Sequence, residues 1–440
     1  MVRSIGALVN EPECAATRPR VLKGYKQTEV GMIPHDWEVR RLKGLISIKG
    51  GVAYSSAYFS DKGPILLTPG NFRLDGGLYF NEKNTKRYSG SYASSMVFSR
   101  GDLLVVMTDL TPECNLLGKP AFVQLDEPIL HNQRIGKIVP TTGRISSSFL
   151  YRYFLSNVHA ARMKSTATGS TVRHTSNTSI YGGLIAIPPT KTEQEAIAGA
   201  LSDVDALIES VEKLVAKKRQ IKQGAMQELL TGKKRLPGFG GKWRTRLLGE
   251  VISHCSSGAT PYRGRLDYYK GEVKWITSGE LNYNLITETI EHISEEAKQK
   301  TNLKLHPVGT FLMAITGLEA AGTRGACGIV GSPSTTNQSC MAIYPTSELR
   351  AEYLYHYYVL RGKDLALQYC QGTKQQSYTA KLVKLLPIAL PPNVEEQSAV
   401  ADVLSEMDVD IDALEARLSK ARLIKQGMMQ ELLTGKVRLV

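Results

Sequence analysis

Three polar loops in each half of the sequence carry side chains suited to reading nucleic-acid bases. An Arg side chain can donate two hydrogen bonds to guanine, and Asn or Gln can pair with adenine in a similar forked way. The loops are Asn71–Asp75, His131–Arg134 and Ser170–Asn177, followed by Glu280–Asn284, Ala320–Arg324 and Lys374–Tyr378. We predict DNA contacts from Asn71, Arg73, Asn132, Gln133, Arg134, Arg173, His174, Asn177, Glu280, Asn282, Thr323, Arg324, Lys374, Gln375, Gln376 and Tyr378.

These candidates differ in how strongly their surroundings support them. The Lys374–Tyr378 loop is the strongest, because two amides, a cation and an aromatic ring follow Gly372 in an apolar neighbourhood. The pairs Asn132-Gln133 and Asn337-Gln338 are weaker, since they stand at matched positions in two halves that we expect to read different bases. Their repetition favours the capping of a turn over base contact.

Motifs of catalysis are missing from the sequence. Both Pro-Pro pairs follow Ile or Leu, so neither forms the Asn/Asp-Pro-Pro-aromatic signature of amino methylation. No Gly-Lys pair is followed by Ser or Thr, which excludes the common phosphate loop, and neither H-E-x-x-H nor G-x-S-x-G occurs. His131 and His306 are interpreted as surface or hydrogen-bonded residues. The sequence therefore predicts a non-catalytic chain without a metal site.

The charge of the chain agrees with a polyanionic partner. Its 440 residues include 55 Lys and Arg against 41 Asp and Glu, which gives a net charge of +14 and a pI near 9.3. Such a surplus favours DNA because each neutralised phosphate releases counterions. A merely basic soluble protein is the alternative. The length predicts two to three domains.

The six cysteines are scattered without metal-ligand spacing, which indicates reduced thiols. No apolar run is long enough for a membrane span, and the first residues make a poor signal peptide. We expect a cytoplasmic protein with no membrane contact and a flexible tail at residues 1–22.

The polar loops alternate with a long segment that is written twice. Ile221–Leu236 and Ile424–Leu439 share fourteen of sixteen residues at a constant offset of 203. Pro-Pro and Glu-Gln pairs upstream keep the same offset. Thr190 with Glu193 and Asn393 with Glu396 have capping-box spacing, and Gly232 and Gly435 fit helix C-termini. The repeat therefore predicts two equivalent helices of about forty residues, or roughly 60 Å each.

Apolar residues at alternating steps of four and three predict a coiled-coil seam between these helices. The alternative is two separate helices, each on its own domain. Gly224 and Gly427 could permit close crossing or a kink, or the helix could break there. The seam positions are Ile197, Leu201, Val204, Ile208, Val211, Val215, Val400, Leu404, Met407, Ile411, Leu414 and Leu418.

A weaker common skeleton links the two regions outside the helices. Trp37 and Trp243 each open a region, and short apolar runs such as Val105–Met107, Ile135–Val139 and Leu184–Ile187 predict strands. The expected fold is α+β, with two pseudo-twofold-related recognition domains separated by antiparallel coiled-coil helices. The expected domains are 23–187 and 237–390, with conserved helices at 188–236 and 391–440. Such domains could read half-sites about 34–36 Å apart.

The sequence resembles the specificity subunit of type I restriction-modification systems. The resemblance rests on Tyr25–Trp37, on the Pro-Pro…Glu-Gln start of each helix and on the duplicated K-Q-G-x-M-Q-E-L-L-T-G-K. It implies two target recognition domains that read an asymmetric bipartite DNA site. It also implies two methyltransferase subunits and restriction/translocase subunits as partners, which would methylate adenine or cleave DNA in host defence. S-adenosylmethionine, ATP and Mg would bind to these partners, with no cofactor on this chain.

Two rival functions stay open at this point. One is an enzyme, such as a methyltransferase or nuclease fused to recognition domains; the absence of an S-adenosylmethionine motif speaks against it. The other is an adaptor whose coiled coil joins proteins without touching DNA, which the charge and polar loops disfavour. The basic runs at 217–219 and 233–235 could follow DNA between half-sites or form a solvated helix face.

Overall fold

The computed structural model describes residues 23–111, 113–372 and 375–439, so the expected tail at residues 1–22 lies outside the described residues. The chain divides into two compact units. Unit 1 comprises the chain up to Ser210 and from Ser419 onward, and unit 2 comprises Val211–Leu418. The division crosses both long helices. Each unit therefore combines one variable domain with a segment of each helix, and each is described by itself.

Unit 1 is built around a four-stranded sheet in the order β4-β11-β7-β9. Successive side chains of a strand point to opposite faces, and those of the central strand β7 enter two different cores. Leu103 and Val105 join the core beneath the helices, whereas Leu104 and Val106 join a core on the other face. The sheet is thus covered on both sides. Its strands are β4 (Ile46–Gly50), β7 (Leu103–Val106), β9 (Pro120–Phe122) and β11 (Ile135–Pro140).

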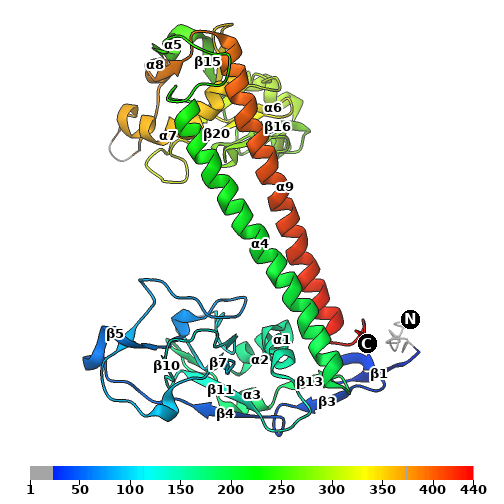
Figure 1. Ribbon diagram of the computed structural model, residues 1–440. Coiled ribbons are helices and arrows are strands. Elements are labelled where there is room, and N and C mark those ends of the chain that lie inside the picture. The colour runs from blue at the N-terminus through cyan, green and yellow to red at the C-terminus, as the bar shows by residue number, and fades with distance from the viewer. Residues whose placement is uncertain (1–22, 112, 373–374, 440) are drawn as a thin grey trace, which may run out of the picture. The chain divides into compact units, whose positions relative to one another are not determined.

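Three helices and several short strand pairs complete the domain of unit 1 (Figure 1). Helix α1 buries Phe149, Leu150 and Tyr153 in the core that also holds Leu103. The helices are α1 (Ser147–Leu155), α2 (Asn157–Thr166) and α3 (Asn177–Tyr181), with short 3-10 helices at Ser56–Tyr58, Pro69–Asn71 and Ser94–Met96. The paired strands are β1 (Tyr25–Thr28) with β2 (Gly31–Pro34), β3 (Glu38–Arg41) with β13 (Leu184–Ile187), β8 (Thr108–Asp109) with β12 (Arg173–His174), and β5 (Phe59–Leu66) with β6 (Arg87–Tyr88) and β10 (Ile129–Leu130).

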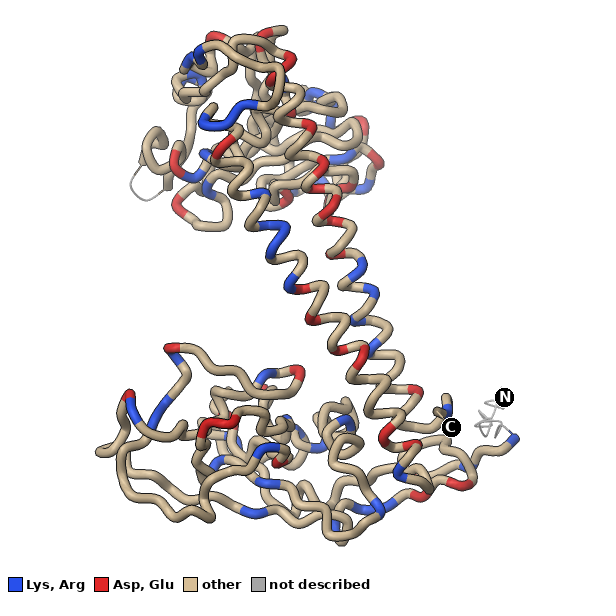
Figure 2. The backbone as a smooth tube through the Cα atoms, in the orientation of Figure 1, with Lys and Arg blue, Asp and Glu red and all other residues tan. Residues whose placement is uncertain are grey.

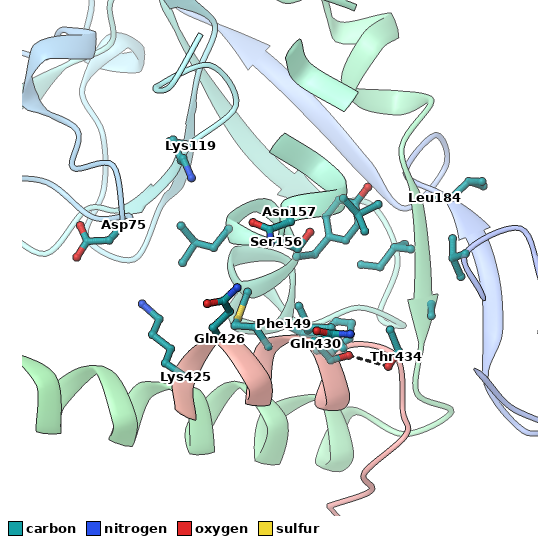
Figure 3. Close-up of a pocket in the computed structure, with 18 of the residues that line it drawn as sticks. Asp75, Lys119, Phe149, Ser156, Asn157, Leu184, Lys425, Gln426, Gln430 and Thr434 are labelled. Atoms are coloured by element: carbon teal, nitrogen blue, oxygen red, sulfur yellow. Dashed lines mark hydrogen bonds between the residues drawn. The ribbon is translucent and has the colours of Figure 1, made fainter. Parts of the chain in front are cut away.

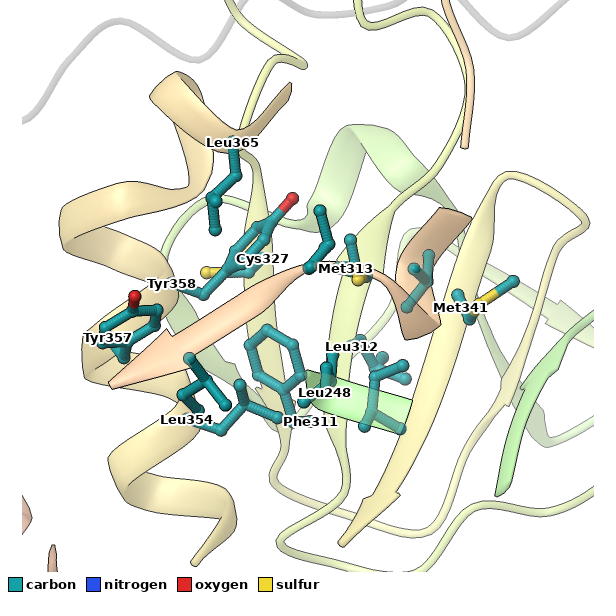
Figure 4. Close-up of a cluster of buried hydrophobic side chains, with 14 of the residues drawn as sticks. Leu248, Phe311, Leu312, Met313, Cys327, Met341, Leu354, Tyr357, Tyr358 and Leu365 are labelled. Carbon is teal, nitrogen blue, oxygen red and sulfur yellow. The ribbon is translucent and has the colours of Figure 1, made fainter. Parts of the chain in front are cut away.

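Unit 2 repeats this plan with a five-stranded sheet in the order β15-β22-β19-β20-β17. Its central strand β19 is buried at every residue. Figure 4 shows Phe311, Leu312 and Met313 of this strand beside Leu354, Tyr357 and Tyr358 of α7. The sheet strands are β15 (Ile252–Ser257), β17 (Asn284–Ile286), β19 (Phe311–Ala314), β20 (Cys327–Val330) and β22 (Cys340–Pro345), and α7 is Ala351–Tyr369.

Smaller elements surround this sheet. A second sheet pairs β16 with β18 and β21, and a further pair joins the first and last strands of the domain. The remaining strands are β14 (Arg244–Leu247), β16 (Val273–Ile276), β18 (Glu291–Ile293), β21 (Thr335–Thr336) and β23 (Pro387–Leu390); the remaining helices are α5 (Leu248–Val251), α6 (Glu295–Lys300), α8 (Ala380–Lys384), η4 (Leu266–Tyr269) and η5 (Ser278–Glu280). The predicted α+β class is confirmed, and the predicted strands correspond to β7, β11 and β13.

The two long helices are α4 (Lys191–Leu229) and α9 (Val394–Leu432), each 39 residues long. In unit 2, Arg219 pairs with Glu415 and Lys222 pairs with Asp408, so the numbering rises along one helix as it falls along the other. The helix segments there are therefore antiparallel. Both helices continue unbroken through Gly224 and Gly427.

The seam positions are all buried or half-buried. Within unit 1, Ile197 and Leu201 share a core with Leu432 of α9; within unit 2, Val400 and Leu404 share one with Leu229 of α4. The fully buried seam residues are Ile197, Leu201, Val211, Val215, Val400, Leu404, Ile411 and Leu418, and the half-buried ones are Val204, Ile208, Met407 and Leu414.

The helix starts are capped, with one difference from the expected capping box. The Thr190 hydroxyl accepts the Glu193 backbone N–H at 3.2 Å, and Asn393 accepts that of Glu396 at 3.1 Å. The two glutamates do not return a bond to the cap. Each is buried and pairs with an arginine that follows the other helix: Glu193 with Arg438 in unit 1, and Glu396 with Arg235 in unit 2. Each carboxylate thus connects the start of one long helix to the segment that follows the other helix, within the same unit.

The neighbouring glutamines explain the second half of the Glu-Gln motif. Gln194 accepts the Ser146 N–H at 2.8 Å and donates to the Arg144 carbonyl at 2.9 Å. Gln397 makes the matching bonds to Arg350 N–H and to the Glu348 carbonyl. Because both amides are buried, each satisfies the backbone just before α1 or α7. The motif therefore fastens each variable domain to the start of its helix.

Candidate nucleic-acid interface

The loops that carry most predicted contacts emerge from one edge of the sheet in unit 1. Strand β11 runs antiparallel to both β4 and β7, so the end of β4, the start of β11 and the end of β7 meet there. The Val52 N–H bonds the His131 carbonyl at 3.1 Å, and the Met107 N–H bonds the Arg134 carbonyl at 2.9 Å. Thr175 N–H in turn bonds the Met107 carbonyl. We call this the reading edge of unit 1.

Three predicted residues come together at this reading edge. Gln133, His174 and Asn177 line one depression of about 210 Å³, beside Thr108. The His174 ring nitrogen Nδ1 lies 3.3 Å from the Thr108 hydroxyl, and Asn177 is the exposed first residue of α3. Arg134 is exposed beside Gln133. The depression offers an amide, an imidazole and a second amide, a donor and acceptor set suited to a base edge.

Arg173 is held in place by its own loop. Its Nη1 donates to the Gly169 carbonyl at 2.6 Å, and its Nε lies 3.3 Å from Sγ of Cys114. Gly169 has a φ of +92°, and a Cβ at that position would lie 2.1 Å from the Val172 carbonyl oxygen. A glycine is therefore required for the turn that presents Arg173.

Unit 2 repeats this frame with different side chains, where the segments at Ile315–Thr316, Asn337–Ser339 and Ser377 meet; we call this the reading edge of unit 2. Gly372 has a φ of +103°, and its Cβ would meet the Gln375 carbonyl at 2.1 Å. Thr316 bridges Ser377 as Thr108 pairs with His174. The frame thus matches while the exposed chemistry differs, with Gln375 exposed on the loop. Lys374 lies outside the described residues.

The predicted residues of the 320–324 and 374–378 loops lie against each other. The Gln376 N–H donates to the Glu319 carboxylate at 2.9 Å, and its carbonyl accepts the Leu318 N–H at 3.1 Å. Arg324 donates to the Leu318 and Glu319 carbonyls, both at 2.9 Å, and is half-buried like Thr323. Two nitrogen atoms of the Arg324 guanidinium are therefore engaged in hydrogen bonds that hold this loop.

Burial or internal hydrogen bonds engage the side chains of four residues that we predicted to contact DNA. Asn71 is fully buried, accepts the Thr68 N–H at 2.9 Å and donates to the Asn84 carbonyl at 3.1 Å. Glu280 has the same role in unit 2, where its carboxylate accepts the backbone N–H groups of Thr277 and Ile290. The two residues each cap a short 3-10 helix, as the matched position in both units suggests.

Tyr378 and Asn132 are the other two predicted residues whose side chains are engaged within the protein. Tyr378 is 3% exposed and belongs to the core of unit 2. Asn132 accepts the Arg134 N–H at 2.9 Å, and Asn337 accepts the Ser339 N–H at 3.0 Å. The Asn-Gln pairs thus cap turns, as the sequence favoured. Gln133 and Gln338, which follow these asparagines, lie near the reading edge of their own unit.

Arg73 and Asn282 are exposed side chains on the first predicted loop of each unit. In unit 1, Leu74 and Asp75 of this loop line a separate pocket of about 510 Å³, and Figure 3 shows Asp75 across from Lys425 and Gln426 of α9. Lys119 also lines it, and partial burial lowers the pKa of its ammonium group. This pocket could not be predicted from the sequence, because residues more than three hundred positions apart form it.

Each unit also exposes large apolar side chains after its first sheet strand, which we did not predict from the sequence. In unit 2, Tyr262 and Leu266 are 74% and 73% exposed. In unit 1, Val52, Tyr58 and Phe59 are also exposed, in the stretch from the loop after β4 to the first residue of β5. Large apolar side chains in a turn-rich segment were the available signal, since such residues are normally buried.

Buried histidines are not part of this interface. His131 bonds the Ile135 carbonyl through Nε2, and His306 bonds Tyr344 and Thr336. Burial lowers the pKa of His131 and lowers that of His306 to about 4. Both rings are therefore neutral, hydrogen-bonded core residues, as the sequence suggested.

Several basic residues of the helices are engaged between the helices. Figure 2 shows basic and acidic residues along both long helices. In unit 2, Lys218 pairs with Asp410 at 2.8 Å and Arg219 with Glu415 at 2.6 Å. Arg235 is held by Glu396 and the Gly240 and Gly241 carbonyls. These contacts weaken the interpretation that the two basic runs follow DNA.

In the part of the chain that the structure describes, no helix combines the length and apolar character needed to cross a membrane. Across the same residues, no group of three or more His, Cys, Asp or Glu side chains could hold a metal ion.

Comparisons with known proteins agree with this geometry. The family described as "Type I restriction modification DNA specificity domain" matches residues 34–222 and 240–421. The EcoR124I/EcoR124II specificity subunit of Escherichia coli is 25% identical over 38% of this chain and 41% of its own length. The MjaVIII specificity subunit of Methanocaldococcus jannaschii is 26% identical over 49% and 50%. The matched stretch thus spans about half the length or less of these curated relatives.

A solved structure shows the same fold. The S subunit of a type I restriction-modification system from M. genitalium aligns with a TM-score of 0.61 over 90% of this chain and 96% of its own, at 14% identity. The family match covers most of the sequence in two consecutive copies, one for each variable domain and the helix that follows it. The chain therefore belongs to the family of type I restriction-modification DNA specificity proteins.

Proposed function

We propose that this chain is the DNA-recognition subunit of a type I restriction-modification complex and reads an asymmetric bipartite site. Each unit would read one half-site through its reading edge. The chain itself would catalyse nothing and bind no cofactor. Two methyltransferase subunits with S-adenosylmethionine, and restriction/translocase subunits with ATP and Mg, would carry out adenine methylation or cleavage in the cytoplasm.

One observation carries this proposal: the two units share a backbone frame but differ in its exposed side chains. Gly169 and Gly372 make the same turn, and His174 and Ser377 occupy the same bridging position. A shared frame with different donors and acceptors is what two readers of different base sequences need. The antiparallel helix segments of each unit leave polar outer faces on which a methyltransferase could dock.

A domain exchange tests the proposal. Residues 240–385 are replaced by the matching domain of a relative, and the chain is expressed with its methyltransferase in a host that lacks other adenine methylation. Sequencing of methylated adenines should show an interrupted motif in which only one half has changed. A continuous palindrome, or a change in both halves, would contradict independent reading by two units.

The adaptor and enzyme alternatives are tested by the same preparation. The purified complex should bind DNA with an affinity that falls steeply as salt rises, because phosphate contacts release counterions. Absence of salt-sensitive binding would favour the adaptor. Methylation by the chain without a methyltransferase subunit would favour the enzyme.

A further inference from the structure

Two large apolar side chains stand almost fully in solvent on one loop of unit 2. Tyr262 is 74% exposed and Leu266 is 73% exposed, and both follow strand β15. Isolated exposed apolar residues are common, but two so close together on a turn form the kind of tip that inserts into a partner. We call Tyr262 and Leu266 the apolar tip of unit 2.

The tip is rigid because its backbone is bonded on both sides. The Arg265 N–H donates to the Tyr262 carbonyl at 3.1 Å, which closes a tight turn. Below it, the Trp275 indole N–H donates to the Ala259 carbonyl at 3.1 Å, and the Tyr269 hydroxyl donates to the Pro261 carbonyl. A rigid loop loses little conformational entropy on binding.

The arginines of the loop are already used internally. Arg263 makes two bonds to the Glu291 carboxylate and stacks on the Tyr269 ring at 4.3 Å. Arg265 makes two bonds to Asp267 and lies 4.5 Å from the ring centre of Tyr268. Their charges are therefore largely balanced, and they stiffen the turn. Both arginines stay about half exposed beside Tyr262 and Leu266, which are the more exposed side chains of the loop.

Hydrogen bonds connect this loop to the reading edge of unit 2. Thr260 bonds the Gln338 side chain, next to the turn that Asn337 caps. Ser339, in the same turn, accepts the Ile315 N–H through its carbonyl, and Thr316 bridges Ser377. The loop that carries Tyr262 and Leu266 and the polar loop that contains Ser377 are therefore both connected to the reading edge of unit 2.

Unit 1 has an exposed apolar loop at the corresponding place. A Cβ on Gly51 would lie 2.3 Å from the His131 carbonyl oxygen, and one on Gly258 would lie 1.8 Å from that of Thr336, the matching residue. The two glycines thus mark the same close crossing at the start of each loop. Beyond it, unit 1 exposes Val52, Tyr58 and Phe59. Of these, Val52 bridges Asn132 at the reading edge of unit 1.

We propose, resting on the proposed function, that Tyr262 and Leu266 form an apolar wedge that inserts between base steps of bound DNA. Proteins that widen or kink DNA insert such side chains to unstack neighbouring bases. The wedge would position the duplex for the polar residues beside it. It would add affinity without adding a phosphate contact.

The test uses the full chain in complex with its methyltransferase and duplexes of the methylated motif that carry 2-aminopurine at successive positions. Binding of the unaltered complex should raise 2-aminopurine fluorescence at one step next to the half-site of unit 2. Tyr262→Ala and Leu266→Ala should each weaken binding by roughly tenfold and abolish this rise, given typical base–aromatic contacts. The slope of log affinity against log salt should not change, because no cation is removed.

Two further variants make the outcome decisive. Tyr262→Phe keeps the ring and should retain both binding and the fluorescence rise, whereas Leu367→Ala removes an exposed leucine of α7 and should change neither. Unchanged affinity and fluorescence in Tyr262→Ala and Leu266→Ala would overturn the wedge while leaving the proposed function intact. Loss of the methyltransferase from these variants, with DNA binding unaffected, would assign the tip to a protein partner and also overturn it. An unaltered complex that binds no DNA would refute both proposals.

Discussion

Polar residues with the same chemistry have different roles here because their burial differs. Asn71 and Asn177 are both asparagines of predicted reading loops. Asn71 is fully buried with its amide bonded to Thr68 and Asn84, whereas Asn177 is exposed at the depression that His174 also lines. Only the second can meet a base without unfolding the loop around it.

Replacement of Asn71 should therefore affect stability and leave specificity unchanged. Asn71→Ala leaves buried backbone groups without partners, which typically costs about 1–3 kcal/mol. Denaturant unfolding should show this loss, while the methylated motif stays the same. Asn177→Ala is the matched variant and should give the reverse: near-normal stability and a relaxed base preference in one half-site. A changed motif in Asn71→Ala would contradict the assignment.

Buried histidines give the protein a predictable sensitivity to acid. His356 is 1% exposed and its Nε2 lies 3.0 Å from the Ser405 hydroxyl; burial lowers its pKa from 6.5 to about 3. Between these values the unfolded chain binds a proton that the folded chain does not. The free energy of unfolding must therefore fall as the pH falls below about 6.5, by roughly 1.4 kcal/mol per pH unit for each such residue.

A comparison of two variants measures this contribution. Unfolding by urea is followed between pH 7 and pH 4 in the unaltered chain, in His356→Gln and in His174→Gln. His356→Gln should have a shallower dependence on pH, because it has no imidazole to protonate. His174→Gln replaces a histidine at an exposed position and controls for the loss of one imidazole. Equal slopes in all three proteins would show that His356 does not contribute.

At the level of elements, the helix repeat uses glycine in two different ways. Gly435 has a φ of +70°, and a Cβ there would lie 2.6 Å from Pro34 and 3.1 Å from the Trp37 ring. Gly427 lies inside α9, and a Cβ would meet nothing within 4 Å. The first glycine is required by the fold of unit 1, and the second is not.

The two glycines should therefore respond to alanine with opposite signs. Gly427→Ala should stabilise the chain by about 1 kcal/mol, because a helix-interior glycine is less favourable than alanine by that amount. Gly435→Ala should destabilise it, because the left-handed backbone and the Trp37 contact both resist a Cβ. Thermal unfolding followed by circular dichroism measures both. A destabilised Gly427→Ala chain would show that the helix needs a glycine there.

Elements were easier to predict than the site, for a physical reason. Helix ends depend on local residues such as Thr190 and Gly232, which act within one turn, so their spacing in the sequence is sufficient. The reading edge depends on which loop residues remain exposed after folding. Asn71 and Glu280 look like reading residues in the sequence, but contacts formed by the surrounding chain bury or occupy them. Tyr262 was missed for the converse reason, since an aromatic residue is expected in a core.

At the scale of the whole molecule, each unit contains its own core, its own reading edge and a segment of both helices. The same arginine–glutamate ion pair recurs in both units: Arg438 with Glu193 in unit 1, and Arg235 with Glu396 in unit 2. Each arginine also lies 5.8 Å from the ring centre of the tryptophan that begins the domain, Trp37 or Trp243. Two such self-contained units should recognise DNA as independent modules.

Independence has a quantitative consequence for binding. Effects of mutations at distant sites without shared partners usually add within roughly 0.3–0.5 kcal/mol. Asn177→Ala in unit 1 and Gln375→Ala in unit 2 should each weaken binding to the methylated motif, and the double variant should show the sum of the two free-energy changes. Each single variant should relax base preference in a different half-site, measured by competition with duplexes altered in one half. A coupling larger than about 1 kcal/mol would mean that binding by one unit changes the other, since neighbouring residues couple by roughly 0.5–3 kcal/mol and distant ones do not.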